Sequence, residues 1–533
     1  MAAAPPQTLR DRQLGRLDGG QFDVLVVGGG INGAVSAAAL AARGVAVALV
    51  ERADFASFTS QESSNMVWGG FKYLENYEIP LVLKLTRSRN RLMRAYPNVI
   101  TELRFLATLD ASAPFPSWLA ALGTVGYWGL GQFATRPPSY HRPGRLQQLE
   151  PVIRTDTAEA AIEYGDAYLK DNDARFVWSF VRSALDHGAA AVNYAEVAGM
   201  TREGDRWRAE ACDRRSGRPL QLTARVVVNA AGPFVDELNR RWGVRTEHRI
   251  VYSKGVHLVV PQLAAAERVL AFFDDSQRLF YVLPMAHRSV IGTTDTRTTD
   301  PDEGVTDADR EFLLSQINAR LNLDAPLTKA DIIAERCGVR PLVVDNDGID
   351  RTDIDWTTLS RKHEIDVDKA AATVTVFGGK LTDCLNVGDE VTAAVRRLGI
   401  RLGPEAEGWY GEAPATARVA FQRAAGDVGL DRAPEVEREA TVADVLWRRH
   451  GPAALQVVEA VAADPSGAEP VLAGTDLLRA ELALYAEREM IVELNDFLRR
   501  RTKAALIQRA ADLAADPGLP EVCRALGLAP LDT

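Results

Sequence analysis

Residues 22–34 read FDVLVVGGGINGA, and the fold follows from this stretch. The apolar, β-branched run FDVLVV is typical of a buried parallel strand. Gly28, Gly30 and Gly33 follow it at the spacing G-x-G-x-x-G. The first glycine allows a tight turn, the second lets backbone approach a pyrophosphate, and the third lets a helix pack closely on the strand. Free N–H groups at the start of that helix favour an anion. The stretch therefore predicts a Rossmann-type dinucleotide site.

The residues after this turn complete a βαβ unit. INGAVSAAALAARG has small residues at helical spacing and ends at Gly44, and the next strand, VAVALVE, ends in Glu51. An acid at this position can accept hydrogen bonds from both hydroxyls of a ribose. A glycine triplet by itself is weak evidence. Strand, glycines, helix, strand and terminal acid together indicate a dinucleotide site rather than a structural turn.

The fingerprint does not distinguish FAD from NAD, but two later stretches favour FAD. Residues 52–65, RADFASFTSQESSN, form a hydroxyl-rich loop that can line a pyrophosphate and a flavin. Residues 222–238, LTARVVVNAAGPFVDEL, read as a second buried strand with a glycine exit, where backbone can pass close to a bound dinucleotide. Taken alone, the second stretch fits an ordinary strand-turn-helix just as well.

Composition and charge set the broad limits. A chain of 533 residues is long enough for two or three domains, and 47% hydrophobic residues supply a sizeable core. A formal net charge of -10 argues against a nucleic-acid partner. The four cysteines, at 212, 337, 384 and 523, have neither disulfide nor metal spacing. No metal site is predicted, and a reducing cytoplasm is expected.

Two segments bear on targeting and membranes. Residues 1–21 carry charges where a signal peptide has an apolar run, and we expect them to form a disordered leader. No continuous apolar run of about 18 residues occurs, so no spanning helix is predicted. Residues 111–135 carry no charge and contain two tryptophans. They can form a buried element of a cap domain, or they can lie in a membrane interface, where Trp and Tyr are favoured.

A series of motifs carries a resemblance to a known family. The motifs are VVGGGINGA, DFASFTSQESSNMVWGGFKYLE, DNDARFV, VVVNAAGPFVDEL, KGVHLVVP, IGTTDT, CGVRPL, VFGGKLTD and, near the C-terminus, REMIVELNDFLRRRTKAAL. From about residue 22 to about residue 506, the chain resembles the FAD-dependent glycerol-3-phosphate dehydrogenases, within the D-amino-acid-oxidase-like flavoproteins. The resemblance implies an α/β fold, α+β overall, with a Rossmann-type FAD domain, an antiparallel-sheet substrate domain and a C-terminal helical domain. It also implies hydride transfer from a secondary alcohol carbon to flavin N5.

The resemblance gives individual residues expected roles. Taking a hydride from an alcohol requires a base for the hydroxyl proton and positive charge to hold an anionic substrate. The expected catalytic residues are His257, Arg340 and Lys380. The expected substrate-binding residues are Lys72, Tyr73, Trp68, Arg340 and Arg361. The expected cofactor-binding residues are Gly28, Gly30, Ile31, Asn32, Gly33, Glu51, Arg52, Thr59, Ser60, Ser63, Ser64, Val197, Ala231, Gly232, Gly379, Lys380, Leu381 and Thr382. The alternatives are a core or surface histidine at 257 and a solvated charge pair at 361–362.

Departures from the family pattern gather near the expected active site. Trp68 stands where the family has a histidine, Asn65 where it has a lysine, and Lys72 where it has an arginine. Asp383-Cys384-Leu385 replaces Thr-Tyr-Arg. Lysine offers a point charge in place of a bidentate fork, and tryptophan adds bulk with a single N–H donor. We expect Trp68 to narrow or reshape the substrate side; alternatively, it packs under the flavin edge.

The motifs and their spacing also predict the domain limits. Residues 22–80, 161–240 and 346–400 are expected to form a discontinuous FAD-binding domain, residues 81–160 and 241–345 the substrate or cap domain, and residues 405–533 the helical domain. The strands of the substrate domain are expected from alternating runs such as RLFYVLPM.

Three functions are compatible with the sequence. The first, which we favour, is an FAD-dependent dehydrogenase of sn-glycerol 3-phosphate or a related phosphorylated polyol, which passes electrons to a quinone or another acceptor. The second is a diverged enzyme for another alcohol or amine, for example in specialised metabolism. The third is a flavin-binding protein without turnover. For the first we expect an anionic small-molecule substrate, a homo-oligomer, and a cytoplasmic location with peripheral contact to the inner face of the membrane.

Overall fold

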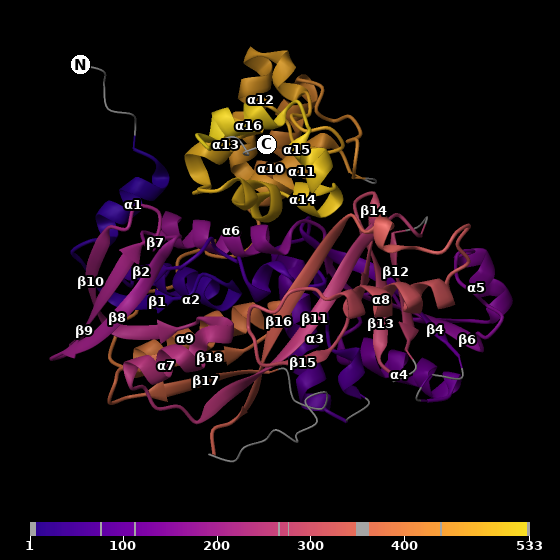
Figure 1. The fold of residues 1–533 in the computed structure, drawn as a ribbon, viewed down its shortest axis with the longest axis horizontal. Coiled ribbons are helices and arrows are strands. Elements are labelled where there is room, and N and C mark those ends of the chain that lie inside the picture. Colours follow the sequence, from indigo (N-terminus) through magenta and orange to yellow (C-terminus); the bar gives the residue numbers. More distant parts are fainter. Residues whose placement is uncertain are drawn as a thin grey trace.

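The structure, a computed structural model, describes residues 7–74, 77–110, 113, 115–264, 267–274, 277–347, 362–437 and 440–529. Two β-sheets lie side by side, and a group of C-terminal helices sits above the junction between them in Figure 1. The first sheet, called sheet A, carries the predicted dinucleotide turn. The second, called sheet B, carries the strands that are expected to face the substrate. This mixed architecture with a C-terminal helical domain confirms the predicted fold class.

Sheet A is built around five parallel strands in the order β18-β10-β1-β2-β7. Its strands are β1 (Gly20–Val27), β2 (Val47–Val50), β7 (Ala190–Val192), β8 (Ala195–Glu203), β9 (Arg206–Asp213), β10 (Pro219–Asn229), β17 (His363–Asp368) and β18 (Thr373–Gly378). Alternate residues of β1 point to opposite faces, so Val24 and Val26 pack on one side while Leu25 and Val27 pack on the other. The first face is covered by α2 (Ile31–Ala41), α6 (Asp173–Asp186) and α9 (Cys384–Arg397), and the second by α1 (Leu9–Leu17) and α7 (Val235–Trp242).

Sheet B follows the order β15-β11-β14-β13-β12-β4-β6-β3, with β16 also paired to β11 and β5 to β6. Its strands are β3 (Met66–Val67), β4 (Ile100–Leu109), β5 (Ser139–His141), β6 (Ala160–Leu169), β11 (His248–Pro261), β12 (Arg268–Phe273), β13 (Leu279–Met285), β14 (Arg288–Gly292), β15 (Thr296–Thr298) and β16 (Ala334–Asp345). The described strands pair antiparallel, apart from the parallel pair of β12 and β4.

Two strands of sheet B fall inside the residue ranges expected for the FAD domain. β6 pairs along its whole length with β4, from Leu169 opposite Ile100 to Ala160 opposite Leu109, and β3 pairs with the end of β6. Pairing to a partner distant in sequence thus overrides the expected limits at residues 80 and 161. The other limits stay predictions.

The expected disordered leader contains an ordered helix, α1, which corrects that expectation. Its charged residues alternate with leucines, so that one face is apolar: Leu14 and Leu17 are buried against sheet A. On the same helix, Arg10 forms an ion pair with Asp213 at 2.7 Å. The charged residues of this segment therefore lie on the solvent side of an amphipathic helix or, as with Arg10, bind it to the sheet.

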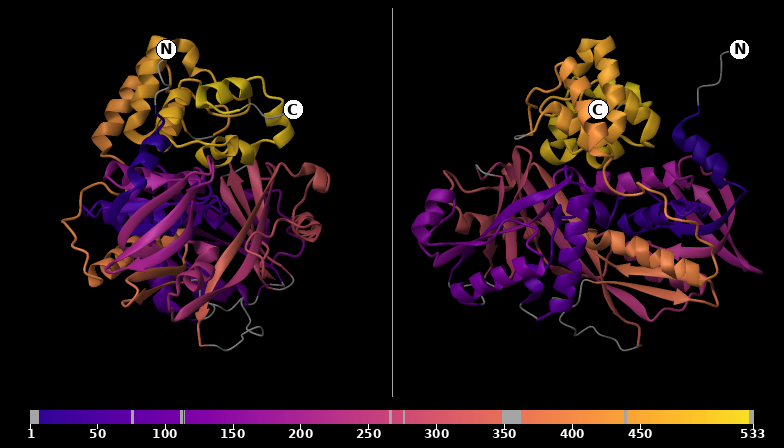
Figure 2. Two further views of the ribbon diagram at one scale, coloured as in Figure 1. Left: turned by 60° about the vertical axis from the view of Figure 1, so that its left-hand side comes forward. Right: turned by 180° about the vertical axis from the view of Figure 1, so that it is seen from behind.

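The remaining helices cover sheet B and form the C-terminal domain (Figure 2). They are α3 (Ile79–Ala95), α4 (Ser117–Leu130), α5 (Pro143–Leu149), α8 (Asp307–Arg320), α10 (Ala415–Asp427), α11 (Val442–His450), α12 (Ala454–Ala463), α13 (Glu481–Arg488), α14 (Ala504–Ile507), α15 (Ala510–Ala514) and α16 (Leu519–Leu526). The C-terminal domain has apolar cores of its own, around Phe421 and Trp447 and around Tyr485 and Phe497. In the part of the chain that the structure describes, no helix combines the length and the apolar character needed to cross a bilayer.

The uncharged segment at 111–135 supplies helix α4. One side of the helix is buried, with Tyr127 only 2% exposed. The other side is apolar and faces solvent: Trp118 is 66% exposed and Leu122 is 62% exposed. The helix is thus a packed element, as the first alternative expects, and it also presents the exposed apolar surface that the second alternative requires.

Candidate active site

The predicted cofactor turn lies at the carboxyl end of β1. Gly28 has a φ of +107°, which side chains disfavour, and a Cβ there would lie 2.5 Å from the carbonyl oxygen of Ala230. A Cβ on Gly33 would lie 1.8 Å from the carbonyl oxygen of Gly28, because α2 packs directly on the turn. A Cβ on Gly30 would lie 3.0 Å from the hydroxyl oxygen of Ser60. Each glycine therefore marks a close approach of backbone to a neighbour.

Glu51 follows β2 directly and holds the same turn through hydrogen bonds. Its carboxylate accepts hydrogen bonds from the N–H of Gly29 at 2.6 Å and from the N–H of Ala53 at 2.8 Å. The side chain is buried, and burial raises the pKa of its carboxyl, although the two N–H donors act in the opposite direction. The acid is thus held by backbone at the position where the sequence predicts a ribose.

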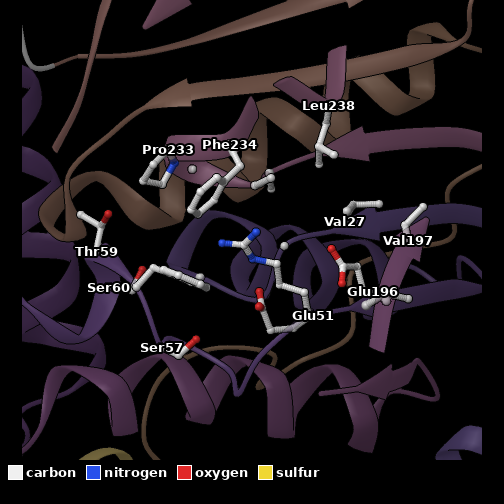
Figure 3. Close-up of a pocket in the computed structure, with 18 of the residues that line it drawn as sticks. Val27, Glu51, Ser57, Thr59, Ser60, Glu196, Val197, Pro233, Phe234 and Leu238 are labelled. Carbon is white, nitrogen blue, oxygen red and sulfur yellow. The ribbon is translucent and has the colours of Figure 1, made fainter. Parts of the chain in front are cut away.

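A pocket opens beside this turn, with a volume of about 830 Å³ including its open mouth. Figure 3 shows Pro233 and Phe234 across the pocket from Glu51 and Ser57. The guanidinium of Arg52 lies 3.8 Å from the centre of the Phe234 ring. The expected cofactor residues that line the pocket are Gly28, Gly30, Glu51, Arg52, Thr59, Ser60, Val197, Ala231 and Gly232.

The other expected cofactor residues lie outside this pocket wall. Ile31, at the start of α2, donates its N–H to the hydroxyl of Ser60 at 3.0 Å, and the Asn32 amide donates to the carbonyl oxygen of Gly378 at 2.8 Å. The second bond joins the first glycine turn to Gly378-Gly379, where φ is +60° and +106°. The remaining ones are Gly33 in α2, Ser63 and Ser64 in the loop after β2, and Lys380, Leu381 and Thr382 at the turn before α9.

The residues present fit FAD at this place. The three glycines leave a cradle that side chains would fill, and Glu51 stands at its end. Asn32 Oδ1, between the two glycine turns, is buried without a hydrogen-bond partner in the described residues, and so are both ring nitrogens of His257. Buried polar atoms without partners are rare in native proteins. They therefore mark a region that extends from the pocket toward sheet B and that suits the polar ring of a flavin.

His257 lies on β11, opposite Arg336 of β16 on one side and Gly292 of β14 on the other. Its ring packs over Gly292, where a Cβ would lie 2.5 Å from ring atom Cδ2. The side chain is 3% exposed. Burial, with the positive charges of Arg336 and Arg340, lowers the pKa of the imidazole well below its usual range. His257 is therefore neutral at pH 7 and can accept a proton.

Arg340 shares a face of sheet B with His257. Along β16 it lies four residues beyond Arg336, which is opposite His257, so all three side chains point to one face. The guanidinium of Arg340 lies across Gly255, where a Cβ would be 2.1 Å from Nη2. Its Nη2 also donates to Thr293 Oγ1 at 2.9 Å, and the side chain is 24% exposed. The structure thus brings a neutral histidine and a cationic fork together on one face of sheet B.

Lys380, Tyr73 and Trp68 form a second group. The Lys380 ammonium donates a hydrogen bond to the Tyr73 hydroxyl and lies 4.1 Å from the centre of that ring. It lies 5.5 Å from the Trp68 ring, and the Trp68 and Tyr73 ring centres are 5.9 Å apart. The backbone oxygen of Trp68 accepts a bond from Thr382 Oγ1 at 3.2 Å. Trp68 therefore shares a cluster with Tyr73, an expected substrate-binding residue, and with Lys380, an expected catalytic and cofactor-binding residue.

Two contacts link the segments that carry the two groups. A Cβ on Gly378 would lie 3.3 Å from the carbonyl oxygen of Pro341, so the turn that leads to the lysine lies against the strand that carries Arg340. On the other side, Asn65 Oδ1 accepts a bond from Arg336 Nη1 at 3.1 Å. This bond connects the loop before Trp68 to Arg336, the residue opposite His257.

The structure gives less detail for two expected substrate-binding residues, Lys72 and Arg361. Lys72 is half-buried in the short turn Phe71–Leu74, beside Tyr73. Arg361 lies outside the described residues.

Asn65, one of the departures, has become part of the scaffold. Its φ is +56°, and its amide donates to the carbonyl oxygens of Leu169 at 3.1 Å and Asp171 at 2.6 Å. With the bond from Arg336, its side chain makes three hydrogen bonds to protein groups. The missing family lysine is thus replaced by a residue that fixes the loop.

Asp383 also stands in a local network. Its Oδ2 lies 2.9 Å from Nδ1 of His363, whose Nε2 is 3.0 Å from Glu390. Against the lowering effect of burial, these carboxylates raise the pKa of His363 to about 9. Cys384 and Leu385 are buried in the core of sheet A. In the altered triplet, Asp383 therefore ties the turn before α9 to His363, while Cys384 and Leu385 pack in the core.

Arg336 is a site residue that the sequence analysis does not single out. It is 1% exposed and donates to Asp173 Oδ2 at 2.5 Å and to the carbonyl oxygen of Gln61 at 2.9 Å. It lies beside His257 and contributes to lowering that residue's pKa. A signal was present, because residues four apart on a strand share a face, and Arg340 lies four residues further on.

Comparisons with known proteins agree with this geometry. Residues 23–361 match the family model described as FAD dependent oxidoreductase, and residues 420–526 match the C-terminal domain of alpha-glycerophosphate oxidase. Glycerol-3-phosphate dehydrogenase 2 of Mycobacterium bovis is 32% identical over 498 residues, which cover 92% of this chain and 82% of the relative. The mitochondrial glycerol-3-phosphate dehydrogenase of Macaca fascicularis is 28% identical over 545 residues, which cover 95% and 70%.

A solved structure shares the fold over nearly the whole length. The glycerol-3-phosphate dehydrogenase from Bacillus halodurans, in complex with FAD, superimposes with a TM-score of 0.71 and covers 98% of this chain and 94% of that chain. The sequence identity is 23%, so this likeness shows the fold alone.

Proposed function

Because this chain belongs to the FAD-dependent glycerol-3-phosphate dehydrogenases, we propose that it oxidises sn-glycerol 3-phosphate, or a closely related phosphorylated polyol, to the ketone. The family assignment confirms an FAD-dependent oxidoreductase, as the sequence predicts. The observation that carries the choice of substrate is the pairing of a neutral, buried His257 with the cationic Arg340 on one sheet face. This pairing supports a substrate that has both a hydroxyl to deprotonate and an anion to hold.

Each side chain has a part in the proposed reaction. The Arg340 fork binds the phosphate, with its orientation set by Thr293, and a ring nitrogen of His257 accepts the hydroxyl proton. We expect Lys380, held by Tyr73, to add a second positive charge for the anionic substrate. The buried position of His257 keeps water away from the proton that it takes. FAD, when bound, supplies the ring that takes up the hydride.

A second candidate is an enzyme of the same family that acts on another alcohol or an amine. The observation that favours it is Trp68, whose ring takes part in the cluster of Lys380 and Tyr73. A bulky apolar ring at this point leaves less room and fewer polar partners than the histidine that the family has there. Substrate shape, rather than charge, would then differ from the rest of the family.

The test is anaerobic reduction of the bound flavin. The loss of its visible absorbance measures this reduction. We expect rapid reduction by sn-glycerol 3-phosphate and none by unphosphorylated glycerol, because Arg340 requires an anion. Reduction by an amine or by an unphosphorylated alcohol, without reduction by glycerol 3-phosphate, would replace the proposal with the second candidate.

The exposed face of α4 supports a membrane-bound electron acceptor, such as a quinone. Trp118, Leu122 and Val125 project from this helix with exposed fractions of 66%, 62% and 51%. Tryptophan is enriched at the level of lipid headgroups, and a large exposed apolar surface is unfavourable in water. Peripheral attachment through α4, on the cytoplasmic face of the membrane, is therefore part of the proposal.

Flotation with phosphatidylcholine–phosphatidylglycerol vesicles tests this attachment. We expect the parent protein to float with the vesicles. We expect the double variant Trp118→Ser, Leu122→Ser to remain in the unbound fraction. The control is Val419→Ser with Leu455→Ser, two exposed apolar residues of the C-terminal domain. An equal loss of vesicle binding in both double variants would count against α4 as the attachment surface. Assembly as a homo-oligomer stays a prediction, which sedimentation equilibrium in detergent can measure.

A further inference from the structure

Three consecutive arginines of the C-terminal domain are buried and have no role in the reaction proposed above. Arg499, Arg500 and Arg501 end a π-helix, Asp496–Arg501, and are 7%, 5% and 0% exposed. Burying a cation is unfavourable unless acceptors with good geometry surround it. The partners of these arginines must therefore be firmly placed.

Two of the arginines converge on one carboxylate of the FAD domain. Arg500 donates through Nε to Asp54 Oδ2 at 2.7 Å. Arg501 makes a bidentate pair with the same carboxylate, at 2.8 Å and 2.9 Å. Asp54 is 0% exposed, and the positive charges of the arginines lower its pKa although burial acts in the opposite direction. Asp54 lies three residues after Glu51, at the start of the loop that follows β2.

The third arginine reaches the far end of the same loop. Arg499 donates through Nη2 to the carbonyl oxygen of Gln61 and to Glu62 Oε2, the latter at 3.2 Å. The same carbonyl oxygen accepts a bond from Arg336, the neighbour of His257. The π-helix therefore anchors the loop at both ends, at residue 54 and at residues 61–62.

The stretch between these anchors is a wall of the cofactor pocket. Residues 56–60 line the pocket, and the Ser60 hydroxyl accepts the N–H of Ile31 at the start of α2. Thr59 Oγ1 donates to the carbonyl oxygen of Val339 on β16 at 2.7 Å. A displacement of this stretch would change the pocket wall and release the contact to the helix start where the pyrophosphate is expected.

We propose that the C-terminal helical domain is part of the cofactor-binding machinery, with Arg499, Arg500 and Arg501 as positioning residues that hold loop 54–62 in its FAD-binding form. The proposal rests on FAD in this pocket and not on the identity of the substrate. Coupling of this kind is reciprocal, so bound FAD also tightens the docking of the C-terminal domain. The three arginines touch the loop, not the reacting atoms.

The first experiment measures the dissociation constant of FAD for the full-length chain by the recovery of flavin fluorescence. Arg499→Gln and Arg500→Gln each remove bonds to the loop and leave Asp54 paired with Arg501. We expect each variant to bind FAD at least about tenfold more weakly than the parent chain. Arg500→Lys, which keeps the charge but loses the fork, should recover part of the affinity.

The matched control is Arg449→Gln. Arg449 is as deeply buried, and its side chain pairs with Glu481 inside the C-terminal domain at 3.1 Å, away from the loop. We expect this variant to lose thermal stability to a similar degree and to keep its FAD affinity within about twofold. Equal weakening of FAD binding in Arg449→Gln and Arg500→Gln would overturn the proposal, because burial alone would then account for the effect.

A second measurement uses the parent chain only, in case the variants do not fold. Hydrogen exchange is compared between the holoenzyme and the full chain stripped of FAD. Because the coupling is reciprocal, removal of FAD should speed exchange at residues 496–501 as well as at loop 54–62, and leave the α11–α12 region unchanged. Unchanged exchange at residues 496–501 would overturn the proposal. This readout involves no turnover, so it is independent of the proposed substrate.

Discussion

The two sides of the candidate active site differ in composition: sheet A supplies a wall of backbone, and sheet B supplies a wall of side chains. Sheet A meets the cofactor with bare backbone, at glycines where a Cβ would lie 1.8–3.0 Å from a neighbouring atom. Sheet B meets the proposed substrate region with long side chains, such as those of His257 and Arg340. A wall of backbone is limited by space and accepts almost no substitution. A wall of side chains can accept substitutions one residue at a time, provided that the required functional groups are kept. The departures at Trp68 and Lys72 lie on that side.

The strongest test of the backbone wall is Gly33→Ala. The added Cβ would lie 1.8 Å from the carbonyl oxygen of Gly28, so α2 must move away from the turn. We expect loss of bound FAD and destabilisation by about 3 kcal/mol, measured by the flavin content of purified protein and by thermal unfolding. The control is Gly123→Ala in α4, where no atom lies within 4 Å of the added group. A full flavin content in Gly33→Ala would break the comparison.

On the side-chain wall, His257→Gln should give the next largest effect. Loss of a general base lowers kcat by about 10²–10⁴-fold. Burial and the neighbouring arginines lower the pKa of His257, so the neutral base is present across pH 6–8. The kcat/KM of the parent enzyme should therefore fall only as the pH drops through that lowered pKa, and Gln should remove this acid limb. His141→Gln on β5 is the control, and an unchanged acid limb in His257→Gln would exclude the histidine as the base.

Arg340→Ala should have a smaller effect on turnover and a large one on binding. Removing a charged hydrogen-bond donor to an anion raises KM by about 100-fold. FAD should stay bound, because Arg340 does not line the pocket beside Glu51. The KM of Arg340→Lys should lie between those of the parent enzyme and of Arg340→Ala, because lysine keeps the charge but cannot make the bidentate contact. Steady-state kinetics with glycerol 3-phosphate measure this, and unchanged kinetics would remove Arg340 from the substrate wall.

Trp68→His should give the smallest change and the sharpest information about specificity. We expect kcat/KM for glycerol 3-phosphate to rise by less than about tenfold, the range typical of one reshaped pocket contact. Trp68 does not line the pocket beside Glu51, so we expect FAD affinity to change little. Equal activity in both forms would favour the alternative in which the ring only packs beneath the flavin edge.

The backbone wall was the part best predicted from sequence. Strand, glycines, helix and Glu51 follow one another within 30 residues, so local pattern is enough. The limits of sheet B were harder, because β6 pairs with β4 some 60 positions away and no local signal records that. Helix α1 was missed for a different reason: its charges suggested disorder, while Leu14 and Leu17 form a narrow apolar face.

For the side-chain wall, the sequence indicates candidate residues but not the contacts that support them. His257 and Arg340 were expected, and the structure puts them on one face. That Asn65 would bond Arg336, or that Asp383 would meet His363, depends on contacts between segments far apart in the chain. A residue that departs from the family motif, and so seems to remove a functional group, can thus form new contacts inside the folded protein.

The contact between Gly28 and Ala230 has a consequence for synthesis on the ribosome. The parallel pair of β1 and β10 joins residues that are about 200 positions apart, and the turn is complete only when both strands are present. At 5–20 residues per second, the nascent chain waits roughly 10–40 s between making the first half of the turn and the second. During that interval β1 can pair with β2 but lacks β10 on its other edge, so we expect protection of that open, apolar edge to affect the yield of folded protein.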